Sequence, residues 1–164
     1  MKPTVYIETT IPNFYYETRT EADIVVRKQW TQEWWENKRH KYDLITSNAV
    51  LEELNSGNYP NKDKIIKLLD DIPLLKTNSS IIEIVQTYIN HKLMPNNPLG
   101  DALHLSLASY YKSDFLLTWN CKNIANPNKF RHIQRINAML QLYTPILTTP
   151  FQLLGGDLSW KMIQ

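Results

Sequence analysis

The sequence predicts an α/β domain whose sheet consists mainly of parallel strands. Short runs of β-branched and aromatic residues recur along the chain, and longer segments with apolar residues at helical spacing separate them. Parallel strands need a crossover connection of roughly a dozen residues or more, which is usually a helix. The alternation of strands and helices therefore favours a parallel sheet.

Four segments have the composition of strands. The first runs from Thr4 to Ile7, with Glu8 at its end and Pro12 closing it. The other three are residues 44–46, 115–118 and 146–147. In open α/β sheets the ligand site lies outside the carboxyl ends of the strands. Polar residues that follow these segments are therefore the first candidates for a functional site.

Six segments have helical features. The first is residues 21–38, where Val26, Trp30 and Trp34 recur on one face. The others are residues 48–56, 62–69, 81–89, 98–111 and 128–142. Trp34 and Trp35 are adjacent and cannot share one helix face. We therefore expect one of these rings to be exposed or to lie in an interface, which is a reason to expect a homodimer.

Composition limits the class of protein. The chain has 164 residues, a net charge of +2 and a single cysteine, Cys121. This length suits one domain, which we assign to residues 1–154, with residues 155–164 as a C-terminal tail. The charge excludes a polybasic DNA-coating protein, and the lone cysteine excludes a disulfide framework or a cysteine-rich zinc module. No long apolar stretch is present, so we expect a cytoplasmic protein without a membrane span.

Acidic side chains follow the expected strands. Glu8 ends the first strand, Glu53 lies on the helix after the second, and Asp101 opens the helix before the third. Asn120 stands just beyond that third strand. Clustered carboxylates repel one another unless a cation lies between them, and oxygen ligands suit Mg²⁺ or Mn²⁺. Such a metal activates water and neutralises charge on a transferring phosphoryl group.

Helical geometry distinguishes Glu53 from its neighbour Glu52. At about 100° per residue, Glu53 lies near the edge of the apolar face of residues 48–56, whereas Glu52 points to solvent. Glu53 is therefore the better ligand candidate. The same helical geometry places Asp101 and His104 on one stripe of the helix expected over residues 98–111, whose other faces are apolar. We expect that helix to be buried against the sheet.

Four segments in this order resemble the PIN-domain family, especially its bacterial VapC-type toxins: VYIETTIPNFY, ITSNAVLEEL, GDALHLSLA and LLTWNCKNIAN. The resemblance covers roughly Val5 to Phe151. It implies a three-layer α/β/α sandwich with a central, mainly parallel sheet of four to five strands. It also implies a Mg²⁺- or Mn²⁺-dependent ribonuclease site.

The resemblance also implies roles for individual residues. Glu8 and Asp101 correspond to primary metal ligands, Glu53 to a further ligand or a positioner of the hydrated metal, and Asn120 to a neutral outer ligand. The chain departs from the family pattern twice, because Glu8 replaces an aspartate and Asn120 replaces a carboxylate. Three carboxylates instead of four favour one tightly held metal and a reduced or altered activity.

Other side chains are expected to support these four. Thr9, Thr118 and His104 would orient carboxylates or waters around the metal. Phosphate contacts would come from the basic residues that follow the third strand. These are Lys122, Lys129, Arg131 and Arg135.

The sequence thus predicts a metal-dependent endoribonuclease that hydrolyses RNA phosphodiesters, as the toxin of a toxin–antitoxin pair with a protein antitoxin as partner. Two alternatives stay open. One is a catalytically weak or inactive PIN-like module that binds RNA or a protein through the same groove. The other is a metal-dependent DNA nuclease of the flap type, although no arch or clamp insertion is evident.

Overall fold

A parallel sheet of five strands forms the centre of the computed structural model, which describes residues 1–94 and 100–155. The strand order is β3-β2-β1-β4-β5, and every neighbouring pair is parallel. The strands are β1 (Thr4–Ile7), β2 (Asp43–Ser47), β3 (Leu74–Leu75), β4 (Phe115–Leu117) and β5 (Ile146–Thr148). The predicted α/β class with a mainly parallel sheet is confirmed.

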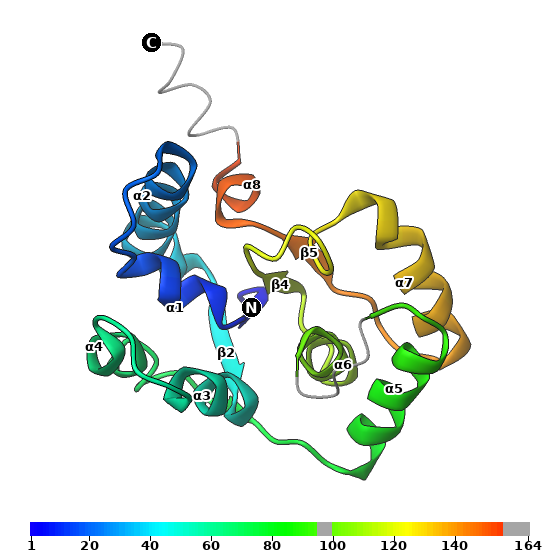
Figure 1. Cartoon of the computed structure of the whole chain (residues 1–164). Helices are drawn as coiled ribbons and strands as arrows, with labels where there is room; N and C mark the ends of the chain where they lie inside the picture. The colour runs from blue at the N-terminus through cyan, green and yellow to red at the C-terminus, as the bar shows by residue number, and fades with distance from the viewer. Residues whose placement is uncertain (95–99, 156–164) are drawn as a thin grey trace.

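Helices cover both faces of this sheet (Figure 1). One layer contains α1 (Thr10–Tyr15), α2 (Ala22–Asn37), α3 (Asn48–Asn55) and α4 (Lys62–Lys67), with a short 3₁₀ turn at Arg39–Lys41. The other layer contains α5 (Ser79–Asn90), α6 (Asp101–Tyr110) and α7 (Pro127–Met139). The last described helix, α8 (Pro150–Leu154), returns to pack against α2. The result is the expected three-layer α/β/α sandwich.

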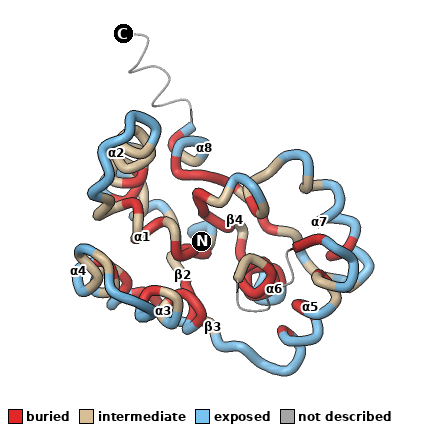
Figure 2. Tube along the Cα trace, viewed as in Figure 1, coloured by how far each residue is buried: buried red, intermediate tan, exposed pale blue. Residues whose placement is uncertain are grey.

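The core lies between these layers (Figure 2). Val5, Tyr6 and Ile7 of β1 have no exposed surface. In α6, every residue from Ala102 to Ser109 is buried, which confirms the expectation that this helix packs against the sheet. Within the described segments, no helix is both long enough and apolar enough to cross a bilayer.

Elements α1, β3 and α8 were not predicted from the sequence. Pro12 was expected to close the first strand, but it lies in the first turn of α1, where proline is tolerated because its missing N–H has no helical partner there. Strand β3 is only two residues long. Helix α8 begins at a capping box in which Thr149 and Gln152 pair reciprocally, and this spacing is a helix-start signal in the sequence.

The expectation that Trp34 or Trp35 would be exposed is wrong. Both side chains are buried because neighbouring elements cover two faces of α2. Trp34 lies against Tyr42, with ring centroids 5.7 Å apart, and Trp35 lies against Tyr15 at 6.3 Å, with the Arg39 guanidinium over its ring. Neither ring is left for a partner, so this reason for expecting a homodimer disappears.

The strand order determines where a site can form. Strands β1 and β4 are neighbours, but the chain leaves β1 into the α1–α2 layer and leaves β4 toward α7 on the opposite face. The connections diverge there, and in open α/β sheets ligands bind outside the carboxyl ends of strands at such a point. Glu8 directly follows β1 and Thr118 directly follows β4, so both lie at this switch point.

Truncation of a buried side chain in α6 tests the packing described above. We expect Leu105→Ala to lower the free energy of unfolding by about 2–5 kcal/mol, because Leu105 is fully buried and its loss leaves a cavity. Ile82→Ala on α5 is the control, because Ile82 is 57% exposed and its truncation should change stability by no more than about 0.5 kcal/mol. Urea denaturation measures both, and equal losses would contradict this packing.

Candidate functional site

Glu8 is held between the ends of β1 and β4. Its Oε1 accepts hydrogen bonds from the Thr10 amide (3.1 Å), the Thr10 hydroxyl and the Thr118 hydroxyl (2.6 Å). The side chain is buried, with 4% of the residue exposed. In the described part of the chain, no residue donates a hydrogen bond to Oε2. Three donors therefore fix one carboxylate oxygen and leave the other available.

The two threonine hydroxyls are themselves fixed by the backbone after β4. The Trp119 amide donates to Thr10 Oγ1 at 2.8 Å, and the Asn120 amide donates to Thr118 Oγ1 at 2.9 Å. Thr118 thus has the supporting position that the sequence predicted. Thr10 was missed, although it follows Glu8 by two residues and, as the first residue of α1, offers an amide without a helical partner.

Glu53 reaches the same place from α3. Ser47 starts this helix as its N-cap and accepts a hydrogen bond from the Val50 amide at 3.3 Å. As the helical wheel predicted, Glu53 is half-buried, whereas Glu52 is exposed. Ligand atoms of Glu8, Glu53 and His104 all lie within 4.8 Å of one another. The structure therefore brings together two of the predicted carboxylates and the predicted supporting histidine.

His104 is bonded through both ring nitrogens. Its Nε2 hydrogen-bonds to Glu53 Oε1, and its Nδ1 lies 2.8 Å from the Tyr6 hydroxyl. The Tyr6 hydroxyl also hydrogen-bonds to the Ser47 hydroxyl, at 2.7 Å. Since neither ring nitrogen is free, His104 orients Glu53 and is not itself a metal ligand in this arrangement. Sequence reasoning missed Tyr6 and Ser47, which lie on strands whose register brings them together.

Burial and charge act in opposite directions on this pair. Burial raises the pKa of the Glu53 carboxyl, but the hydrogen bond and positive charge of His104, with a smaller effect of Thr9, bring it below the ordinary value. Burial lowers the pKa of His104, but Glu53 and the charges of Glu8 and Asp101 raise it above 6.5. The geometry thus favours an imidazolium–carboxylate pair.

The donor set fits a hard divalent cation. Glu8 Oε2 and the Glu53 carboxylate supply oxygen, which Mg²⁺ and Mn²⁺ prefer. Thr9 Oγ1 is buried beside Glu53 and satisfies no hydrogen-bond geometry with any described residue. A buried hydroxyl without a partner is costly, and a water of a hydrated cation would satisfy it. Thr9, Glu8 and Glu53 together therefore fit the metal that the sequence predicted.

Asp101 is clamped by two asparagine amides. Asn120 Nδ2 donates to Asp101 Oδ1 at 2.7 Å, and Asn123 Nδ2 donates to Oδ2 at 2.8 Å. The Asn123 backbone amide donates to Asn120 Oδ1 at 3.0 Å, which fixes the amide orientation. Asn120 thus directs its nitrogen, not its oxygen, at the predicted ligand. Asn123 was missed, because an asparagine in a loop carries no distinctive sequence signal.

One of the four predicted RNA-binding cations joins this network. Lys129 Nζ donates to the Leu93 carbonyl at 2.9 Å and to Asn123 Oδ1 at 3.3 Å. Burial lowers the pKa of Lys129, with Asp101 opposing and Lys122 reinforcing the shift. The other three, Lys122, Arg131 and Arg135, are exposed in the β4–α7 loop and on α7.

No protein-family model matches the chain, and a comparison with curated proteins also finds no match. The resemblance to PIN domains therefore stays a prediction from the four sequence segments.

The His104–Glu53 pair gives a pH signature in metal-free protein. We expect the His104 imidazole to titrate above 6.5, and Glu53→Gln to lower its pKa because the hydrogen-bonded charge is gone. The raised pKa of His104 stabilises the fold below 6.5 and the lowered pKa of Glu53 stabilises it above 4.5. The stabilisation is thus complete between these values, then fades in acid and as pH rises through the folded pKa of His104. NMR titration and pH-dependent denaturation measure these effects, and an unchanged His104 pKa in Glu53→Gln would contradict the pairing.

Proposed function

We propose that the chain is a metal-dependent endoribonuclease, with its reaction centre at the carboxyl ends of β1 and β4. The observation that supports this most is the approach of buried Glu8 and half-buried Glu53 beside the unpartnered hydroxyl of Thr9. Like charges brought together in this way call for a cation. The resemblance to PIN domains supplies the reaction class and the RNA substrate.

Glu8 and Glu53 are the side chains that would hold Mg²⁺ or Mn²⁺, and Asp101 would contribute through the carboxylate lone pairs that the two amides leave open. When bound, the cation supplies positive charge to the phosphoryl oxygens and lowers the pKa of a water molecule. Hydrolysis would form one P–O bond to the water oxygen and break one P–O bond of the RNA backbone, and a proton lost by the water would be balanced by one gained by the departing oxygen. A lean oxygen site suits Mg²⁺, because waters and substrate phosphate complete its octahedron.

The surrounding residues orient these carboxylates. His104, supported by Tyr6, holds Glu53 through Oε1. Thr10 and Thr118 hold Glu8 in the same way. Neighbours of this kind fix the direction of a ligand and typically change metal affinity or activity by about 10–100-fold when removed.

The toxin role belongs to the same proposal and comes from the resemblance alone. Its partner is a protein antitoxin, and a small gene next to the one for this chain would support it.

The amide clamp favours a second candidate, a PIN-like module that binds RNA without cutting it. Asn120 and Asn123 each donate a hydrogen bond to Asp101, so this carboxylate is stabilised without a cation. Because these amides already stabilise the negative charge of Asp101, that carboxylate depends less on a bound cation. In this alternative the surface at the carboxyl ends of β1 and β4 would bind the RNA backbone, together with the Lys129 ammonium.

Substitution of the carboxylates tests the ribonuclease. We expect Glu8→Gln and Asp101→Asn each to abolish Mn²⁺-dependent cleavage of a mixed RNA pool, because each loses a charged oxygen ligand. His104→Asn should reduce cleavage by roughly 10–100-fold, since it only orients Glu53. Glu52→Gln is the matched control, because Glu52 is exposed on the same helix. Full activity of both carboxylate variants would exclude this site.

Restoring a carboxylate at position 120 separates the two candidates. If the site is a weakened nuclease, Asn120→Asp should raise cleavage and tighten Mn²⁺ binding, because the new charge faces Asp101. Asn128→Asp, at an exposed position on α7, controls for the added charge. RNA cleavage and calorimetric Mn²⁺ titration provide the readouts. RNA binding without cleavage or Mn²⁺ binding, in both wild type and Asn120→Asp, would establish the binding module instead.

A further inference from the structure

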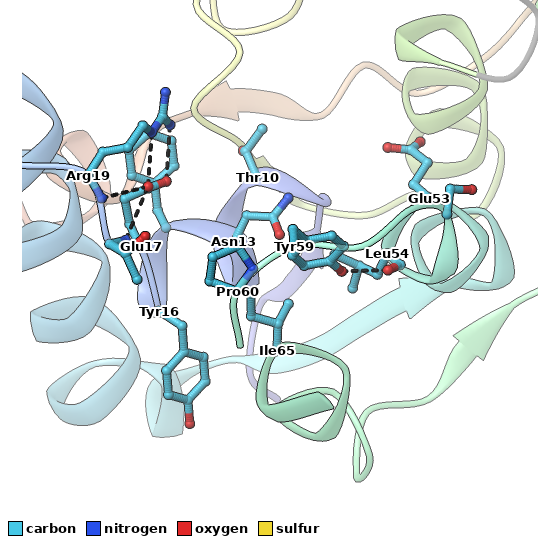
Figure 3. A pocket seen from close by; sticks show the side chains of 13 residues that line it. Thr10, Asn13, Tyr16, Glu17, Arg19, Glu53, Leu54, Tyr59, Pro60 and Ile65 are labelled. Atoms are coloured by element: carbon cyan, nitrogen blue, oxygen red, sulfur yellow. Dashed lines mark hydrogen bonds and ion pairs between the residues drawn. The ribbon is translucent and has the colours of Figure 1, made fainter. Parts of the chain in front are cut away.

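A cavity of about 470 Å³ opens beside Glu53, between α1, the loop that follows it and the segment after α3 (Figure 3). Thr10 and Glu53 line this cavity and also belong to the candidate metal site. The cavity and the candidate metal site therefore share two residues. Cavities that enclose small ligands have volumes of roughly 300–1,000 Å³, so this one has the size for a nucleotide.

The cavity has a fixed aromatic wall. The Tyr59 hydroxyl donates to the Leu54 carbonyl, and Leu54 is the residue after Glu53 on α3. This bond fixes the ring relative to the carboxylate, and Pro60 extends the same wall. Unstacked bases of single-stranded RNA bind by stacking on aromatic rings of this kind.

A free amide faces the same space. Asn13 lies in the middle of the cavity lining, between Thr10 and Pro60 (Figure 3). Among the residues that the structure describes, none forms a hydrogen bond with its side chain. An asparagine amide presents a donor and an acceptor side by side, which is the pattern that reads the edge of a base.

The charges around the cavity are already paired. Arg19 binds Glu17 through two parallel contacts, Nε to Oε1 at 2.9 Å and Nη2 to Oε2 at 3.0 Å. This pairing lowers the pKa of the Glu17 carboxyl to about 2. Glu53 is paired with His104. Neither carboxylate is left uncompensated to repel an RNA phosphate at the entrance.

We propose that this cavity is a nucleobase pocket, in which Asn13 reads the base and Tyr59 stacks on it while the adjoining phosphate lies at the Glu8–Glu53 site. The pocket selects the nucleotide next to the cleaved bond. This inference rests on the proposed ribonuclease function for its consequence, but base binding itself needs no cleavage. Asn13 and Tyr59 are specificity residues in this arrangement.

Binding of single nucleotides tests the pocket without cleavage. The full chain is titrated with AMP, GMP, CMP, UMP and ribose 5-phosphate, and amide NMR shifts are followed. We expect at least one nucleotide to shift the Asn13 and Tyr59 signals, and ribose 5-phosphate to leave them unchanged. The four nucleotides should differ in affinity, since the amide distinguishes base edges. Absence of base-dependent shifts at Asn13 and Tyr59 would overturn the pocket.

Variants assign the binding to individual side chains. Asn13→Ala should weaken the preferred nucleotide about fivefold, as loss of one hydrogen bond does. Tyr59→Leu should weaken every nucleotide by about fivefold or more, because stacking is lost. Tyr59→Phe keeps the ring but loses the bond to the Leu54 carbonyl, so it should weaken binding less than Tyr59→Leu. Asn37→Ala, exposed at the end of α2, is the matched control. Equal affinities in Asn13→Ala and Asn37→Ala would overturn the reading role.

Cleavage-site sequencing of an RNA pool in Mn²⁺ separates this inference from the ribonuclease proposal. Cleavage with a base preference that Asn13→Ala changes and Asn37→Ala preserves would support both. Cleavage with the same preference in all three proteins would overturn the pocket and leave the ribonuclease standing. Nucleotide binding that depends on Asn13, together with an absence of cleavage, would support the pocket and overturn the ribonuclease.

Discussion

One carboxylate oxygen, Glu8 Oε1, connects the sheet to the site. A buried carboxylate is costly unless donors surround it, and here Thr10 and Thr118 provide them from the segments that follow β1 and β4. Trp119 extends this anchoring outward, because its backbone amide binds Thr10 and its indole Nε1 donates to Thr31 on α2 at 2.8 Å. The position of Glu8 is therefore set by the pairing of β1 with β4 and by the packing of α2.

Glu53 and Asp101, the other two predicted carboxylate ligands, are held by partners of different chemistry. On the α3 side, Glu53 is paired with an imidazole whose pKa is raised, so its charge balance responds to pH. On the α6 side, Asp101 is held by neutral amides of Asn120 and Asn123, which do not titrate. In the proposed function, a cation held by Glu53 would compete with His104, whereas one held by Asp101 would compete only with neutral amides. Glu53 therefore already has a charged partner, whereas Glu8 and Asp101 accept hydrogen bonds only from neutral groups.

The sequence predicted those parts of the fold and site that local patterns determine. Strand β1, the parallel sheet and the choice of Glu53 over Glu52 followed from composition, alternation and helical geometry. Asn123 could not be found in this way, because its partner Asp101 lies far from it in the chain. Thr10 is close to Glu8 in the chain, but the local pattern does not show that its hydroxyl turns back to that carboxylate. The burial of both Trp34 and Trp35 was missed for a related reason: periodicity describes one helix face, whereas two layers enclose α2.

In the proposed function, helix α3 would connect base recognition to the carboxylates of the metal site. Glu53 points to the carboxylate cluster, and the adjacent Leu54 carbonyl holds the Tyr59 ring that lines the cavity. The helix begins at Ser47, whose hydroxyl also hydrogen-bonds to Tyr6, and Tyr6 in turn hydrogen-bonds to His104. Both ends of α3 are thus tied to the same hydrogen-bond system. A displacement of this helix would move the carboxylate and the aromatic wall together, so in the proposed function one helix would set the distance between the base and the phosphate.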